Sequence, residues 1–259
     1  MIIGIIPARM ASSRFPGKPL AKICGMPMLG HVFFRSKMSS IFDEVYIATC
    51  DKVIAEYAGS IGAKAIMTKD THQRASDRTA EAMLKIEKKN KKKVNIIVMI
   101  QGDEPMLFPE MIGEAVKPIL ENRSIQVVNL MSSLRSKYEQ NDPHEIKIVV
   151  DLNNFALYFS REPIPSWKKG AVSVPMFKQV CIIPFRRDFL IRFNELKPTP
   201  LEIVESIDML RILEHGYKVK MVMTKFNTHS VDTPEDLRKV EKLMKNDLLV
   251  NKYLRKLRQ

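Results

Sequence analysis

Apolar residues in the first hundred positions fall into blocks of two kinds. Apolar runs at residues 2–6, 44–49, 63–68 and 94–100 predict strands, and the very hydrophobic run at 94–100 is typical of a central strand buried on both faces. Apolar residues at helical spacing predict helices over 26–38, 52–61 and 76–89, with Asp51 and Ser76 as N-caps of the last two. This alternation predicts a doubly wound, mostly parallel, Rossmann-like α/β sheet.

The pattern changes after residue 123. Short apolar runs at 126–131, 146–150, 156–160 and 179–185 follow one another through short turns, which predicts an inserted, partly antiparallel portion. Helices at 189–194 and 201–215, a strand at 218–223 and one long helix from residue 234 complete the chain. We expect a single domain over residues 1–259, with divisions into 1–123, 124–230 and 231–259.

The charge balance raises two classes of function. The 259 residues include 42 Lys and Arg against 29 Asp and Glu, a formal net charge of +13. Such a balance suits a binder of nucleic acid or membrane surfaces, or an enzyme acting on anionic small molecules. Much of the excess lies in 85–93 and 239–258, on expected helices with few aromatic residues for base stacking. This distribution favours the enzyme, with no nucleic-acid or membrane partner.

The three cysteines, Cys24, Cys50 and Cys181, lie in unrelated segments without CxxC spacing. Neither a disulfide framework nor a zinc site is indicated. Residues 2–6 read as a core strand rather than as part of a signal segment, and no apolar run approaches 18 residues. We therefore expect a cytoplasmic protein.

Candidate chemistry begins in the loop after the first expected strand. Small residues there would let backbone N–H groups approach an anion, and three cations accompany them. The small residues are Ala8, Ala11, Ser12, Ser13 and Gly17, and the cations are Arg9, Arg14 and Lys18. The stretch is neither a Walker loop nor a GxGxxG fingerprint. It predicts a phosphate site at the carboxyl edge of the sheet, while solvated surface charge remains the alternative.

Two carboxylates stand in further motifs. Asp103 lies in the turn QGDEP, directly after the central strand, where a hard dication could bridge it to phosphate oxygens. Asp232 lies in VDTPEDL, which is also a favourable helix start whatever the function. A turn-forming role for Asp103 and a helix-start role for Asp232 are the structural alternatives.

The loop IIPARMASSRFPGKPL, QGDEP and VDTPEDL together resemble the CMP-KDO synthetases, the 3-deoxy-manno-octulosonate (KDO) cytidylyltransferases. Matches in family order extend over nearly the whole chain, including the string YFSR at 158–161. The resemblance implies the nucleotide-sugar transferase fold, CTP and an acidic sugar as substrates, Mg²⁺ as cofactor, and a homodimer. It also implies a reaction whose nucleophile is the sugar's own anomeric hydroxyl.

The same resemblance implies the roles of individual residues. Asp103 and Asp232 would hold Mg²⁺, and Arg9 and Lys18 would act on the phosphates. Nucleotide contacts would come from Pro7, Ala8, Arg9, Ser12, Ser13, Lys18, Thr68, Lys69 and Gln101. The sugar acid would be contacted by Arg78, Gln101, Gln179, Ile183, Glu202 and Glu205.

Two stretches depart from the family pattern. In the loop at 72–78, Arg74, Ala75 and Ser76 replace Ser-Gly-Thr, and we expect Arg74 to point outward. At 178–185, Gln179 and Ile183 stand where the family has a histidine and a tyrosine that touch the octulosonate. We therefore expect KDO to be a poorer substrate than an acid with a less polar or amino-bearing tail.

The sequence supports a cytidylyltransferase for a KDO-like sugar acid. Other acidic sugars, such as 8-amino-KDO or a nonulosonate, are the alternative within this class. Outside it, the alternatives are a noncatalytic nucleotide-sugar binding protein and a nucleic-acid binding protein.

Overall fold

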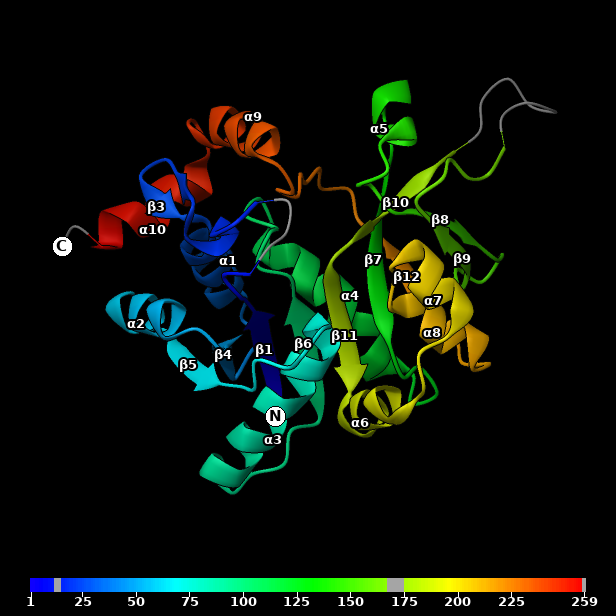
Figure 1. Ribbon diagram of the computed structural model, residues 1–259, viewed down its shortest axis with the longest axis horizontal. Coiled ribbons are helices and arrows are strands. Elements are labelled where there is room, and N and C mark those ends of the chain that lie inside the picture. The colour runs from blue at the N-terminus through cyan, green and yellow to red at the C-terminus, as the bar shows by residue number, and fades with distance from the viewer. Residues whose placement is uncertain (12–14, 167–174, 258–259) are drawn as a thin grey trace. The chain divides into compact units, whose positions relative to one another are not determined.

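The computed structural model, which describes residues 1–11, 15–166 and 175–257, divides into two units (Figure 1). The first contains Met1–Gly113 and Thr228–Gln259, and the second contains Glu114–Asn227. Helix α4 (Pro109–Glu121) carries the chain from one unit to the other. The second unit spans the middle of the chain, and the divisions expected at 1–123, 124–230 and 231–259 stay predictions.

The first unit is built on four parallel strands in the order β6-β1-β4-β5. These are β1 (Ile2–Pro7), β4 (Glu44–Thr49), β5 (Lys64–Met67) and β6 (Ile96–Ile100). The helices α1 (Met28–Lys37), α2 (Lys52–Ser60) and α3 (Ala75–Asn90) connect them. Strand order runs outward from β1 to β5 and then returns to β6 on the other side of β1. The carboxyl ends of β1 and β6 therefore flank a topological switch point, the usual position of a ligand in an open α/β sheet.

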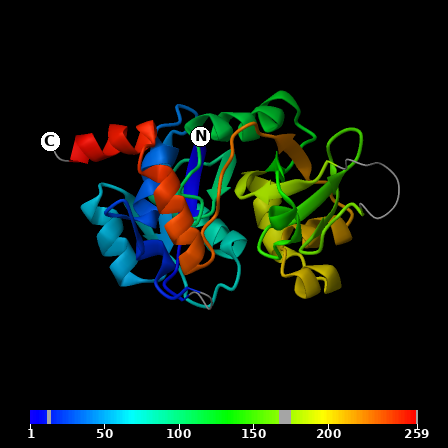
Figure 2. The same ribbon diagram turned by 90° about the horizontal axis from the view of Figure 1, so that it is seen from above.

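Short elements complete this unit. A 3₁₀ turn, η1 (Lys18–Leu20), leads into a two-stranded hairpin made by β2 (Lys22–Ile23) and β3 (Met26–Pro27). After the chain returns at Thr228, α9 (Pro234–Met244) and α10 (Leu248–Leu257) follow. Of these C-terminal helices, coloured orange and red in Figure 2, α10 packs against α1 and α9 packs against β2. Among the described residues, no helix combines the length and the apolar character needed to cross a membrane.

The second unit contains a mixed sheet in the order β12-β7-β10-β8-β9. Its strands are β7 (Val128–Ser133), β8 (Lys147–Val150), β9 (Ala156–Ser160), β10 (Phe177–Val180) and β12 (Lys220–Met223). Only β12 and β7 pair in parallel; the other neighbours are antiparallel, as expected for this portion. Also in this unit are β11 (Ile182–Arg186), α5 (Lys137–Asn141), α6 (Arg187–Glu195), α7 (Pro200–Glu205) and α8 (Met209–Glu214).

Several expected elements differ from the structure. Ser76 is not the N-cap of α3; Arg74 takes that position, and its backbone N–H donates to Asp77 Oδ2 at 3.4 Å. The strand expected at 179–185 belongs to two strands, β10 and β11, which are separated at Cys181. The helix expected at 201–215 is broken at Ser206, whose φ of 54° cannot continue a helix. The terminal helix is likewise two helices.

Candidate active site

The loop that follows β1 is closed by its own backbone. Gly17 N–H donates to Met10 O at 3.2 Å, and Gly17 has φ of 74°, a conformation that glycine adopts without strain. Met10 N–H in turn donates to the Asp51 carboxylate at 2.8 Å. Asp51 therefore anchors the loop, and its side chain makes no capping bond to α2. Ser12 and Ser13, expected to contact the nucleotide, lie outside the described residues.

Lys18, which opens η1, joins the three motifs found in the sequence. Its ammonium group lies 2.8 Å from Asp103 Oδ2, 3.4 Å from Asp232 Oδ1 and 2.9 Å from the carbonyl oxygen of Val231. Burial lowers the pKa of Lys18, but the carboxylates of Asp103 and Asp232 raise it more, so the net shift is upward from 10.5. Lys18 is consequently a fixed positive charge between the two carboxylates.

The backbone brings the two carboxylates together. Val231 N–H donates to Asp103 O at 3.0 Å, which holds the turn before α9 against the loop after β6. Thr233, rather than Asp232, is the N-cap of α9: its hydroxyl accepts from Asp236 N–H at 3.2 Å. The favourable helix start is therefore real, and it leaves the Asp232 carboxylate directed toward Lys18.

This pair of carboxylates fits a divalent cation. Both reach one positive group, so both can reach one metal ion in its place, and carboxylate oxygens are the ligands that Mg²⁺ prefers. Within the described ranges there is no cluster of three or more acidic, histidine or cysteine side chains suited to a metal. Two protein ligands are sufficient for Mg²⁺ where water and substrate phosphates complete its coordination.

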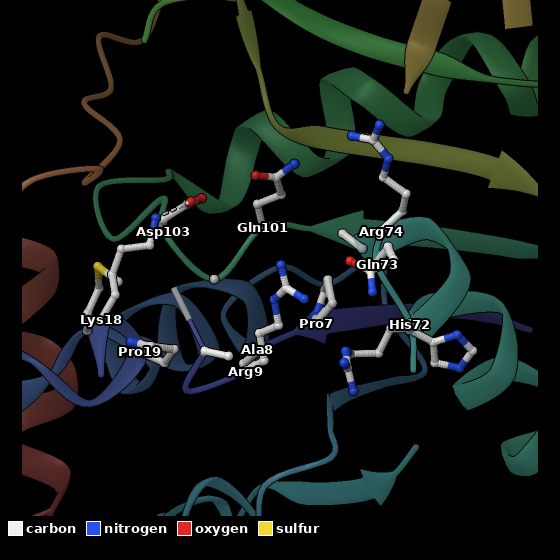
Figure 3. Close-up of a pocket in the computed structure, with 15 residues that line it drawn as sticks. Pro7, Ala8, Arg9, Lys18, Pro19, His72, Gln73, Arg74, Gln101 and Asp103 are labelled. Atoms are coloured by element: carbon white, nitrogen blue, oxygen red, sulfur yellow. Dashed lines mark hydrogen bonds and ion pairs between the residues drawn. The ribbon is translucent and has the colours of Figure 1, made fainter. Parts of the chain in front are cut away.

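A pocket opens beside these residues at the carboxyl edge of the sheet (Figure 3). Its lining comes from the ends of β1 and β6, the loop after β1, η1, and the start of α3. The residues with polar or charged side chains are Arg9, Lys18, His72, Gln73, Arg74, Arg78, Gln101 and Asp103. Four of these are Arg or Lys and one is a carboxylate, which favours an anionic ligand. Arg74 lines this pocket, although we expected it to point outward.

Arg78 has the most restricted position of these cations. Its side chain is 2% exposed, and Nη1 donates to Thr68 Oγ1 at 2.5 Å and to Lys69 O at 3.4 Å. Nη2 is buried and has no hydrogen-bond partner among the described residues. A buried guanidinium with an unused donor next to a pocket is ready to bind an oxygen of a ligand.

The loop between β5 and α3 is held by Glu81, which the sequence did not single out. Its Oε2 accepts from Lys69 N–H at 2.9 Å and contacts His72 Nε2 at 2.5 Å, and its Oε1 pairs with Lys85. Burial raises the pKa of Glu81, but Lys85, the Lys69 N–H and His72 outweigh it and lower the pKa to about 2. Glu81 is therefore an anion that fixes the pocket-lining loop. The sequence signal that could have identified Glu81 is its position one helical turn after Arg78.

Comparison with known proteins decides the family. The family model described as cytidylyltransferase matches residues 3–221. The chain is 42% identical to a 3-deoxy-manno-octulosonate cytidylyltransferase from Geobacter metallireducens, covering 93% of this chain and 97% of the relative. It is 41% identical to a mitochondrial enzyme of the same name from Arabidopsis thaliana, covering 94% and 83%.

The chain belongs to the CMP-KDO synthetase family. A solved CMP:2-keto-3-deoxy-manno-octonic acid synthetase complexed with CTP is 35% identical. It superimposes with a TM-score of 0.86 over 95% of this chain and 99% of the other. The expected nucleotide-sugar transferase fold is thereby confirmed.

The sugar-contact residues that this family suggested in the second unit make internal bonds there. Glu202 is fully buried, and both its carboxylate oxygens accept from Arg211, at 2.6 and 2.7 Å. Glu205 accepts from Ser160 Oγ and from Arg161 N–H, each at 2.8 Å. These bonds give both carboxylates a structural function, and their contact with a sugar stays a prediction.

Gln179 and Ile183, which depart from the family pattern in the second unit, are buried. Gln179 donates from Nε2 to Asn129 Oδ1 at 2.5 Å, and the same Asn129 donates to Val180 O at 2.8 Å. Ile183 is 1% exposed. A sugar contact at either position also stays a prediction.

Proposed function

We propose that this protein transfers the cytidylyl group of CTP to KDO, giving CMP-KDO and pyrophosphate. The observation that carries the proposal is the convergence of Lys18, Asp103 and Asp232 beside a cationic pocket at the switch point of the sheet. The relatives that match over nearly the whole chain are named for this activity.

The reaction needs no nucleophile from the protein. The anomeric hydroxyl oxygen of the sugar attacks the α-phosphorus, and the bond from that phosphorus to the β-phosphate oxygen breaks in line with the attack. The protein positions the two reactants and stabilises negative charge. Arg9 and Lys18 are the cations we assign to the phosphates, since both line the pocket. We assign Lys18 to the phosphates for the state in which Mg²⁺ would take its place between Asp103 and Asp232.

Asp103 and Asp232 are the residues we assign to Mg²⁺. When bound there, the ion would neutralise charge on the α-phosphate and favour the ionised form of the attacking hydroxyl. The support in this chain is that the two carboxylates already share one cation, Lys18.

The remaining nucleotide contacts are assigned by their place in the pocket. Pro7, Ala8 and Gln101 line it, while Thr68 and Lys69 hold the Arg78 guanidinium in position. We assign the open donor of Arg78 to an oxygen of the sugar acid, because it is a cationic group with an unused N–H.

We also infer that the protein acts as a homodimer formed through its second unit. Leu157 lies on the edge strand β9, and Ile203 and Val204 lie on α7; these side chains are 62, 64 and 82% exposed. Glu205, at the end of α7, bonds Ser160 of β9, so the two elements are adjacent. Exposed apolar groups on and beside an edge strand favour association with a second copy. Sedimentation equilibrium should give twice the chain mass, and Val204→Glu should give the single-chain mass. A wild-type protein of single-chain mass would contradict the inference.

Pyrophosphate release tests the activity. CTP, UTP, ATP and GTP are each supplied with KDO, 8-amino-KDO and a nonulosonate, with and without Mg²⁺. With CTP and KDO, we expect pyrophosphate release when Mg²⁺ is present and none when it is absent. Neutralising the exposed lysines at 88–93 is the matched control, because these side chains lie on the end of α3 and in the following turn and do not line the pocket. Tight, salt-dependent association with DNA or RNA and no pyrophosphate would favour the nucleic-acid alternative instead.

A further inference from the structure

Two fully buried polar side chains lie one turn apart on α1. His31 and Arg35 are both 0% exposed, on a helix whose other buried side chains are apolar apart from Ser36. Positions four residues apart share one face of a helix, so both side chains point in the same direction. Buried polar groups of this kind require partners, and each of these two has one partner in the C-terminal segment and one on a backbone carbonyl.

His31 connects α10 to the hairpin after Lys18. Its Nε2 lies 2.7 Å from Ile23 O, and its Nδ1 lies 2.6 Å from Tyr253 Oη. A carbonyl oxygen only accepts, so Nε2 carries the proton and Nδ1 accepts from the tyrosine hydroxyl. Burial lowers the pKa of His31 to about 4, so the ring stays neutral and both bonds persist at neutral pH.

Arg35 makes the equivalent connection to the loop after Asp103. Nη2 pairs with Asp247 Oδ2 at 2.5 Å, and Nη1 donates to Leu107 O at 3.1 Å. Asp247 lies between α9 and α10, so this ion pair fixes the C-terminal segment against α1. The guanidinium also lies over the ring of Phe108, at 5.9 Å from its centroid.

These four bonds converge on the segments that carry the site. Ile23 follows Lys18 closely in the chain, Leu107 follows Asp103 closely, and the C-terminal segment begins just after Asp232. A further bond, from Cys24 N–H to Glu241 at 2.9 Å, ties the same hairpin to α9. Bonds from one face of α1 thus fix chain segments that lie next to Lys18, Asp103 and Asp232 in the sequence.

We propose that His31 and Arg35, through Tyr253 and Asp247, are positioning residues for the divalent cation and the phosphates. The proposal rests on the proposed function for the identity of the ligands. It assigns the C-terminal helices a role in aligning Lys18, Asp103 and Asp232. Residues that hold the loop between β5 and α3, such as Glu81, are not part of this network of bonds. Loss of a bond in the network should therefore weaken cation and CTP binding, with little effect on the sugar.

Tyr253→Phe removes one hydroxyl and keeps the ring, which stacks on Phe34 at 5.5 Å between centroids. We expect the dissociation constant of Mn²⁺, measured by electron paramagnetic resonance with CTP present, to rise about three- to tenfold. The Mg²⁺ concentration for half-maximal pyrophosphate release should rise by a similar factor, and the KM for KDO should stay within about twofold of wild type.

Tyr57→Phe is the matched control, because the Tyr57 hydroxyl is buried without a hydrogen-bond partner among the described residues. It should change none of these constants. A Tyr253→Phe protein with a lowered melting temperature but wild-type Mn²⁺ and Mg²⁺ constants would overturn the proposal, and so would an equal rise in Tyr57→Phe. If wild-type protein released no pyrophosphate, the proposed function would fail, while Mn²⁺ binding would still test the positioning role.

Discussion

Lys18 occupies the position at which the carboxylates of Asp103 and Asp232 share one positive charge. Replacing Lys18 by methionine removes this charge and leaves the space filled. Methionine keeps most of the aliphatic length of lysine and removes the charge. In the metal-free protein, Asp103 and Asp232 then face each other without the ammonium group that lies 2.8 and 3.4 Å away in the wild type. Their mutual repulsion should destabilise the fold.

The size of this effect follows from burial. The side chains of Lys18, Asp103 and Asp232 are 13, 20 and 15% exposed. Breaking a fully buried pair costs about 3–5 kcal/mol, and an exposed pair contributes about 0–1 kcal/mol. We therefore expect a loss of about 1–3 kcal/mol in the free energy of unfolding. The loss should be full below the ordinary lysine pKa of 10.5 and shrink as pH rises through the higher pKa of the folded protein.

Urea denaturation of both proteins, with and without millimolar Mg²⁺, measures the effect. The ion can take the place of the ammonium group, so Mg²⁺ should restore most of the stability of Lys18→Met at matched ionic strength. Lys22→Met, at an exposed lysine in the adjacent hairpin, should cost little under either condition. If Lys18→Met loses the same free energy with and without Mg²⁺, then the two carboxylates do not share a divalent cation, and the reasoning is wrong.

Three other outcomes follow from the structure. Asp103→Asn should lower kcat about 10²–10³-fold while leaving the circular dichroism spectrum unchanged; full activity at saturating Mg²⁺ would remove Asp103 from the metal site. His31→Gln should lose less of its free energy of unfolding in acid than the wild type does. The wild type should lose about 3 kcal/mol as pH falls from 6.5 to about 4, because the unfolded chain protonates this histidine and the folded one does not; identical urea midpoints against pH would refute the assignment. Gln179→His should raise kcat/KM for KDO relative to 8-amino-KDO, and an unchanged ratio would show that this position does not select the sugar.

The apolar runs predicted the strands well, because a strand that is buried on both faces has an almost continuous run of apolar residues in the sequence. The strands expected at 44–49 and 156–160 have those bounds in the structure. The breaks at Cys181 and Ser206 left no such pattern. The left-handed conformation of Ser206 accompanies a bond from Ile207 N–H to Glu202 O, a contact that residue spacing does not reveal.

The site was only partly predictable for a similar reason. Asp103 and Asp232 could be found by their motifs, but their sharing of Lys18 depends on the Val231–Asp103 backbone bond between distant segments. In the sequence, His31 lies within the helix expected at 26–38 and belongs to none of the motifs that marked the site. Its importance emerges only when α10 brings the Tyr253 hydroxyl to its ring.

The proposed reaction transfers the α-phosphorus of CTP to a sugar acid. A single-turnover experiment with CTP labelled at the α-phosphate, excess KDO and Mg²⁺ tests it most directly. We predict that the label appears in CMP-KDO with one pyrophosphate released for each sugar consumed, and that omission of Mg²⁺ prevents both. Label recovered as free CMP in equal amounts with and without sugar, or CTP left intact, would contradict the account.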